Sequence, residues 1–150
     1  MDEIDRQLLG ELQRDADRSL LDLGDIVGLS ASAVQRRIAR LKSDGIIAGV
    51  HAKLDAGRLG LPVTIVTTVR FERDSPAHTN NLIEKLKARP EVQLLHSLAG
   101  QTDLLIVTVL GEVSDYTDGV LADLEADANA VRIETNVSLG VLKSTDELPI

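Results

Sequence analysis

The chain has 150 residues, enough for one globular domain or two small ones. Hydrophobic residues make up 43% and charged residues 27%, which excludes a disordered or collagen-like chain. The chain has no Cys, which excludes disulfides, thiolate metal sites and a cysteine nucleophile. Phe71 and Tyr116 are its only aromatic residues, so the composition also argues against a nucleic-acid reader built on aromatic stacking.

The sequence shows no recognisable motif for metal binding or catalysis. His51, His78 and His96 lie far apart, so we expect no metal site and no cofactor. Neither a Gly-x-Ser-x-Gly elbow nor a Gly-rich phosphate loop occurs, and we expect no enzyme. The acidic start of the chain and the lack of an apolar run of about 20 residues predict no signal peptide or membrane span. We therefore expect a cytoplasmic protein.

The net charge of −8 argues at first against a nucleic-acid partner, because affinity for phosphate depends on Lys and Arg. The distribution of charge changes this conclusion. Residues 1–60 carry nine basic and ten acidic side chains, whereas residues 61–150 carry seven basic and fourteen acidic ones. Within the first half, residues 36–58 hold six basic and two acidic side chains, a local charge of +4. This segment is the only positive patch along the sequence.

Apolar residues at helical spacing predict three helices in the first half, over residues 3–16, over 20–28, and from Ser30 to Gly45. The period then changes to about two over 46–54, which predicts a strand or β-wing. Gly and Pro are concentrated in residues 55–62. We therefore place a domain boundary there, between a first domain with its linker over 1–60 and a second domain over 61–150.

The second half alternates between strand and helix patterns. Strands are predicted over 63–71, 91–100, 102–111 and 130–142, with one helix after the break at Asp74, Ser75 and Pro76 and another from Ser114 as N-cap. The order β-α-β-β-α-β predicts a ferredoxin-like domain, so the fold class is α+β. Because both helices would cover one face of the sheet, the other apolar face is expected to bind a second copy.

The Gly28-Leu29-Ser30 turn between two predicted helices is typical of a helix-turn-helix, whose second helix enters the major groove of DNA. Small or polar residues at its start suit contact with bases, and the cations that follow suit contact with phosphates. The predicted DNA-binding residues are Ser30, Ser32, Ala33, Gln35, Arg36, Arg37, Arg40, Lys42 and Lys53. A plain three-helix bundle with a solvated Arg face would show the same helical pattern, but the wing and the positive patch favour double-stranded DNA as the partner.

A second candidate site is the turn Gly100-Gln101-Thr102-Asp103 between two predicted strands. Gly lets backbone N–H groups approach a carboxylate, while an ionised Asp can hold an ammonium group. Together these are the two charged ends of a free amino acid. A β-hairpin turn also uses Gly and Asp without any ligand, so the residues alone leave both interpretations open.

The sequence resembles the Lrp/AsnC family, the leucine-responsive or feast/famine regulators, almost from end to end. The resemblance rests on Ile4, Asp5, Leu8 and Leu9, on Gly28-Leu29-Ser30, on Arg37, Ile38 and Leu41, on Gly45 and Ile47, on Gly100, Asp103, Leu104 and Leu105, and on Glu134, Thr135 and Lys143. Many members carry an aromatic residue where this chain has Thr102. The resemblance implies a winged helix-turn-helix domain followed by a ferredoxin-like effector and dimerisation domain.

The resemblance also implies a transcription regulator whose oligomeric state or DNA affinity responds to an amino acid or a related small molecule. The implied effector site comprises Gly100, Gln101, Thr102 and Asp103, together with Thr135, Asn136 and Ser138, at an interface between dimers. Dimers, often assembled into octamers, are further implied. The alternative is an amino-acid-binding or assembly module without DNA binding. Under the regulator hypothesis, Arg36→Ala or Arg40→Ala should weaken DNA binding and leave the oligomer intact.

Overall fold

The computed structural model describes residues 1–72 and 76–150, and the side chains of residues 76–79 lie outside the description. The predicted break at Asp74 and Ser75 also lies outside it. The described chain divides into two compact units, which we call unit 1, residues 1–53 with 142–150, and unit 2, residues 54–141. The boundary between functional domains that the sequence suggests, between residues 60 and 61, stays a prediction. No helix of the described residues is long and apolar enough to cross a membrane.

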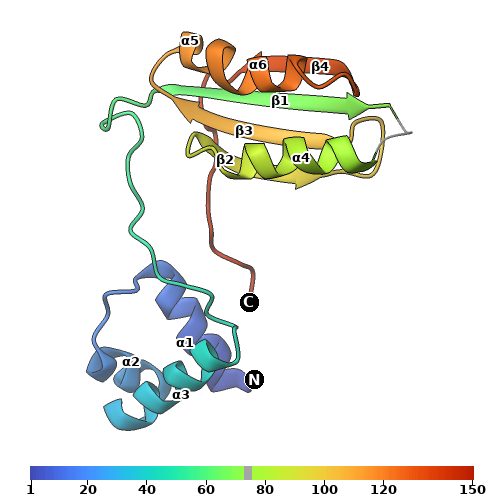
Figure 1. Ribbon diagram of the computed structural model, residues 1–150. Coiled ribbons are helices and arrows are strands. Elements are labelled where there is room, and N and C mark those ends of the chain that lie inside the picture. The colour runs from blue at the N-terminus through green and yellow to red at the C-terminus, as the bar shows by residue number, and fades with distance from the viewer. Residues whose placement is uncertain (73–75) are drawn as a thin grey trace. The chain divides into compact units, whose positions relative to one another are not determined.

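Unit 1 contains the three expected helices, α1 (Glu3–Arg14), α2 (Leu20–Val27) and α3 (Ala31–Ser43) (Figure 1). Each begins at a polar N-cap, respectively Asp2, Ser19 and Ser30, whose side chain accepts a backbone N–H of the first turn. Leu8, Leu23 and Val34, one from each helix, are completely buried against one another. This small apolar core orients α3 relative to the other two helices.

The predicted strand over residues 46–54 is wrong, because these residues form no strand. The backbone N–H groups of Ile46 and Ile47 both donate to the carbonyl oxygen of Leu41, at 3.0 and 3.1 Å, and so complete the C-terminal end of α3. A strand also needs a partner to pair with, and the described part of unit 1 has none. The domain is therefore a helix-turn-helix without the β-wing that the sequence suggested.

Unit 2 contains an antiparallel sheet in the order β2-β3-β1-β4, built from β1 (Val63–Phe71), β2 (Val92–Ser97), β3 (Leu104–Leu110) and β4 (Ala130–Val137). α4 (Pro76–Lys87) connects β1 to β2. A second helical segment connects β3 to β4. This is the predicted β-α-β-β-α-β order, and the α+β fold class is confirmed. β4 ends at Val137, five residues before the predicted end.

The second helical segment differs in detail from the prediction. It consists of α5 (Val113–Tyr116), a π-helical turn over Thr117–Leu121 and α6 (Ala122–Glu125). Its N-cap is Glu112, not Ser114: the Glu112 N–H donates to Asp115 Oδ2 at 3.0 Å. Ser114 instead lies within the first turn. The π-helical turn was not predicted from the sequence.

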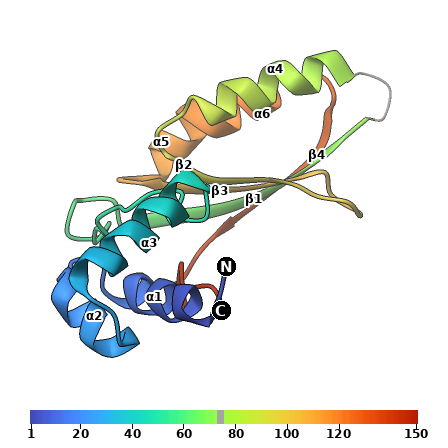
Figure 2. The same cartoon turned by 90° about the horizontal axis from the view of Figure 1, so that it is seen from below.

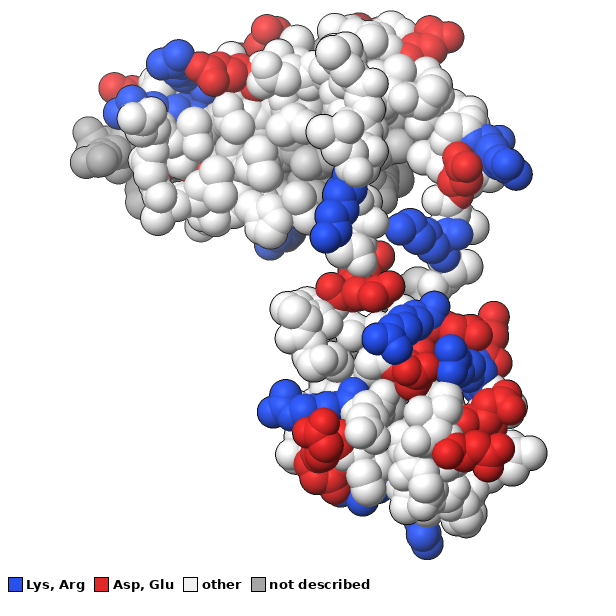
Figure 3. Space-filling model, turned by 180° about the vertical axis from the view of Figure 1, so that it is seen from behind, with Lys and Arg blue, Asp and Glu red and all other residues white. Residues whose placement is uncertain are grey.

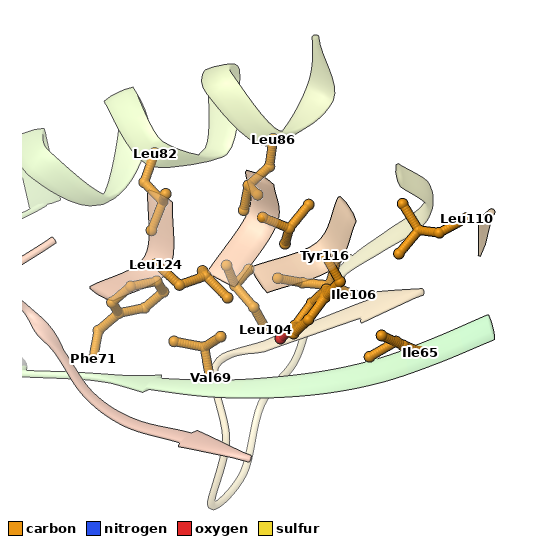
Figure 4. Packing of buried hydrophobic residues seen from close by; sticks show 11 residues of the cluster. Ile65, Val69, Phe71, Leu82, Leu86, Leu104, Ile106, Leu110, Tyr116 and Leu124 are labelled. Atoms are coloured by element: carbon orange, nitrogen blue, oxygen red, sulfur yellow. The ribbon is translucent and has the colours of Figure 1, made fainter. Parts of the chain in front are cut away.

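The helices of unit 2 all cover one face of the sheet (Figure 2). Between the helices and the sheet lies a core made almost wholly of aliphatic side chains, in which Phe71 and Tyr116 are the aromatic members (Figure 4). The other face presents Val66 of β1, Leu105, Val107 and Val109 of β3, and Leu94 of β2, all of them half-buried or exposed. Seen from that side, the middle of this open face carries few charged groups (Figure 3).

Candidate functional site

The turn between α2 and α3 has the tight geometry that a helix-turn-helix requires. Gly28 adopts a left-handed conformation with φ of 70° and ends α2. The Leu29 N–H donates to the Gly24 carbonyl at 2.9 Å, which folds the turn back onto α2. A Cβ atom at Gly24 would lie 2.5 Å from the Leu29 carbonyl oxygen, so the close approach requires glycine there. Gly24 was not among the residues predicted from the sequence to have a role, although a glycine inside a predicted helix was the available signal.

The N-terminal half of α3 presents polar side chains to solvent. Ser32, Gln35 and Arg36 lie at positions i, i+3 and i+4, on one exposed face, and Val34 is buried on the opposite side. Within residues 1–72 and 80–150, Gln35 and Arg36 form no hydrogen bond or ion pair through their side chains. An amide and a guanidinium that are exposed on one helix face are the groups that bind base edges in the major groove. This face is the candidate DNA-binding surface.

Arg37 and Arg40 lie on another side of α3, where they contact α1. Arg37 Nη1 lies 2.8 Å from Asp5 Oδ1 and 2.7 Å from Asp2 Oδ2, and Arg40 Nη2 lies 2.7 Å from Asp5 Oδ2. The Asp5 side chain is completely buried, while the side chains of Arg37 and Arg40 are 25% and 51% exposed. Both arginines were predicted to bind DNA phosphates. Their contacts assign them a role in fastening α3 to α1.

The surroundings of Asp5 favour its ionised form. The Asp2 N–H donates to the Asp5 carboxylate at 3.0 Å, and this bond is the main reason that the pKa of Asp5 lies below its ordinary value. Burial acts in the opposite direction, while hydrogen bonding from Arg37 and the charge of Arg40 lower the pKa further. A buried carboxylate that is charged at neutral pH and bonded on both oxygens can hold two helices at a fixed rotation about their axes.

The other predicted DNA-binding residues differ in their surroundings. The Ser30 hydroxyl accepts the Ala33 N–H at 3.3 Å and lies 3.1 Å from the Ser32 hydroxyl, so Ser30 caps α3. Ala33 is half-buried. Lys42 is exposed in the last turn of α3, and Lys53 is exposed in the extended segment that follows the helix. The structure therefore brings Ser30 to Lys42 together on one helix and leaves Lys53 apart from them.

In the turn that was predicted to bind an effector, Asp103 has a structural contact. Its Oδ2 atom accepts the Phe71 N–H at 2.8 Å, beside the irregularity in β1 between Arg70 and Phe71, and its own N–H donates to the Val69 carbonyl. Gly100 and Gln101 are exposed, and the space around Gly100 is open. Thr102 is half-buried. The turn therefore exposes its backbone at residues 100 and 101, while Asp103 ties it to β1.

The three predicted effector residues of β4 and the segment after it lie elsewhere. The Thr135 hydroxyl is 2.8 Å from the Tyr116 hydroxyl, which is 2.8 Å from that of Thr67, so Thr135 points toward the helices. Asn136 pairs with Val66 and therefore lies on the open face. The Ser138 N–H donates to Thr64, near the opposite end of β1 from the residues that Asp103 contacts. One copy of the chain does not gather the predicted effector residues into one cavity.

Two hollows in unit 2 are lined by other residues. One, of about 430 Å³, lies between α4 and the end of α6 and contains the ion pair of Lys85 with Asp123. The other, of about 390 Å³, lies where β1 and β4 meet near Arg70 and Arg132. Among the residues that the structure describes, no group of three or more His, Asp or Glu side chains is placed to hold a metal ion.

Comparisons with known proteins find a matching family model for each unit. The family model of the AsnC-type helix-turn-helix domain matches residues 1–42, and that of the Lrp/AsnC ligand binding domain matches residues 64–148. The glutamate uptake regulatory protein of Zymomonas mobilis is 30% identical over 150 residues, which are 100% of this chain and 91% of that protein.

Solved structures extend the likeness to three dimensions. The crystal structure of an AsnC family transcriptional regulator from Agrobacterium tumefaciens has a TM-score of 0.90 and 28% identity, with 99% of this chain and 97% of that chain covered. A transcriptional regulator from Neisseria meningitidis, solved as a complex with L-Met, has a TM-score of 0.91 over 99% of this chain and 96% of that chain. At 24% identity, the second likeness concerns the fold.

Proposed function

The chain belongs to the Lrp/AsnC family of transcriptional regulators, and we propose that the exposed face of its α3 selects the operator. The observation that carries this proposal is the group Ser32, Gln35 and Arg36 on that face, after a turn that only glycine allows at Gly24. Gln suits adenine and Arg suits guanine in the major groove. Lys42 and Lys53 contact phosphates in this proposal, and residues 1–60 act as the DNA-binding domain.

The open face of the sheet in unit 2 supports self-association. Its apolar residues from β1, β2 and β3 would be covered if two copies packed these faces together. A palindromic operator requires two copies of α3 about one helical turn of DNA apart, and a two-fold dimer supplies two copies of the helix. We propose this dimer, assembled further into an octamer, as the active form in the cytoplasm, where operator DNA is available.

An amino acid is the proposed effector, held by residues 61–150. The exposed backbone at Gly100 and Gln101 suits a carboxylate, with Thr102 beside it. Asn136 and Ser138 supply polar groups on a different part of the sheet. Because these two groups lie apart in one copy, the proposed site is completed where copies of the chain meet. An effector that binds two assembly states unequally would change DNA affinity.

Fluorescence anisotropy with the DNA upstream of the protein's own coding region tests the proposal. The full chain is titrated at several salt concentrations with excess competitor DNA, with and without a pool of the twenty amino acids. Tight binding that resists competitor and changes with the pool supports the proposed function. Absence of sequence preference here and in a genome-wide selection would instead support the alternative, an amino-acid-binding or assembly module without DNA binding. The pool would then stabilise the protein against heat without any DNA binding.

A further inference from the structure

Both ends of the chain belong to unit 1, because residues 142–150 group with residues 1–53. Near the end of α1, Gln13 Nε2 donates to the Leu148 carbonyl at 3.2 Å, and Gln13 Oε1 accepts the Leu148 N–H at 2.6 Å. A side-chain amide that bonds both backbone groups of one residue copies the paired exchange between antiparallel strands. Figures 1 and 2 both place the C-terminus near α1.

This contact depends on hydrogen bonds between the Gln13 side chain and the Leu148 backbone, and not on apolar burial. The side chains of Leu148 and Ile150 remain exposed, at 68% and 50%. Two local bonds shape the segment, from the Glu147 N–H to the Thr145 hydroxyl at 3.1 Å and from the Ile150 N–H to the Leu148 carbonyl at 2.9 Å. Gln13 is therefore the residue on which the attachment of the C-terminal segment to α1 depends.

The chain passes between the two units twice, after Lys53 and after Val141. The second passage begins four residues after β4 ends at Val137. Of the proposed effector residues, Asn136 lies near the end of β4 and Ser138 directly follows the strand. Leu148 follows Ser138 by only about ten residues. A short segment that is anchored at both ends limits how freely its two anchors move apart.

Unit 1 contains the contacts needed to pass a change at Leu148 on to α3. Gln13 and Asp5 are on the same helix, and Asp5 bonds both Arg37 and Arg40 of α3. Packed helices and ion pairs are the kind of contiguous contacts that carry coupling between sites. The Gln13 contact thus connects two stretches. One is the chain from β4 to Leu148, and the other is α1 from Gln13 to Asp5, which bonds the proposed DNA-binding helix α3.

From these contacts we propose that the face of α1 at Gln13 is a docking surface for the chain's own residues 142–150. The docked segment transmits ligand-linked changes in β4 to the DNA-binding helix. This inference rests on the proposed ligand response. It assigns Gln13 to communication between the ligand and DNA sites, and not to either site.

Hydrogen exchange of the Leu148 amide in the full chain tests the docking. Gln13→Ala removes both bonds, so we expect the Leu148 amide to exchange about tenfold faster than in the wild type. Gln7→Ala, a change at an exposed glutamine of the same helix, is the matched control and leaves the exchange rate unchanged. Equal exchange in the wild type and Gln13→Ala overturns the docking.

Anisotropy measurements with and without the amino-acid pool test the coupling. Leu148→Pro removes the N–H that Gln13 accepts, while Leu148→Ala retains it. The measured quantity is the ratio of the Kd values for DNA with and without the pool. In Gln13→Ala and Leu148→Pro we expect this ratio to move toward 1 by a factor of about three or more. In Gln7→Ala and Leu148→Ala it should stay as in the wild type. An unchanged ratio in both disrupting variants overturns the coupling. A wild-type chain that binds its operator but ignores the pool contradicts the proposed ligand response and the coupling with it, and the exchange experiment then decides the docking alone.

Discussion

The carboxylate of Asp5 on α1 receives a hydrogen bond from Nη1 of Arg37 on α3, with 2.8 Å between the two atoms. Asp5 is completely buried, and its second oxygen bonds Arg40. This relationship separates the cations of α3 into two groups. Arg37 and Arg40 hold the helix in place, whereas Arg36 is exposed on the face that we propose to contact DNA.

Asp5→Asn is expected to destabilise unit 1 in a pH-dependent way. The pKa of Asp5 in the folded chain is lower than in the unfolded chain, so its stabilisation is complete above pH of about 5 and is lost as the pH falls through the folded value. At pH 7 we expect a loss of about 1–3 kcal/mol in the free energy of unfolding, and a smaller loss below pH of about 4.

Urea unfolding followed by far-UV circular dichroism measures this difference, because both aromatic residues lie in unit 2 and fluorescence would not report on unit 1. Asp25→Asn, at an exposed acid of α2, is the control and should change stability little at any pH. A difference between the wild type and Asp5→Asn that stays constant from pH 7 to pH 3 would contradict the assigned role.

Arg36→Ala is expected to weaken operator binding about tenfold, because one bidentate contact to a base contributes roughly 1–3 kcal/mol of discrimination. The thermal midpoint should not change, since the Arg36 side chain is exposed and forms no hydrogen bond or ion pair with the described residues. Arg6→Ala removes an equal charge from an exposed position of α1 and serves as the control. Equal affinities of the two variants in anisotropy titrations would refute the placement of the DNA-binding face.

Arg40→Ala should behave differently from Arg36→Ala. Its removal takes one of the two guanidinium partners from the buried Asp5, so we expect unit 1 to lose stability. Weaker DNA binding in this variant would therefore not by itself identify a phosphate contact. Measuring DNA affinity at a temperature well below the unfolding midpoint separates the two effects. A thermal midpoint equal to that of the wild type would show that the Asp5 bond contributes no stability.

Gly24→Ala is expected to destabilise unit 1 by about 1–3 kcal/mol, because the new methyl group would overlap the Leu29 carbonyl oxygen and force the turn to move. Gly10→Ala is the matched change in α1, where a Cβ atom meets nothing within 4 Å. That variant should be neutral or more stable by up to about 1 kcal/mol. Urea unfolding compares them, and equal effects of the two substitutions would be inconsistent with the geometry of the turn.

Tyr116→Phe is expected to cost about 1–2 kcal/mol of stability in unit 2, because the buried Thr67 hydroxyl loses its 2.8 Å partner. Thr135→Val, its counterpart at the other end of the same chain of hydroxyl groups, should cost less, since Tyr116 keeps its bond to Thr67. Thermal unfolding followed by circular dichroism compares the two. A larger loss in Thr135→Val would mean that Thr135 has a further role.

Local residue patterns were sufficient to predict most of the fold. Apolar spacing predicted the three helices of unit 1, and alternation predicted the four strands and their order, because both depend on contacts between residues close in sequence. The Gly28-Leu29-Ser30 turn was predicted for the same reason. The prediction failed at residues 46–54, where alternation was present but the backbone donors of Ile46 and Ile47 bond the end of α3.

The sequence by itself determined the fold class, the helix-turn-helix and the positive charge of α3, since these follow from composition and from short-range periodicity. Only the tertiary structure decided which way each polar side chain points. It turned Arg37 and Arg40 toward Asp5, placed Thr135 against Tyr116, and bonded Gln13 to Leu148 across 135 residues of chain. These contacts join residues far apart in sequence, and local spacing carries no information about which distant partner will lie within hydrogen-bonding distance.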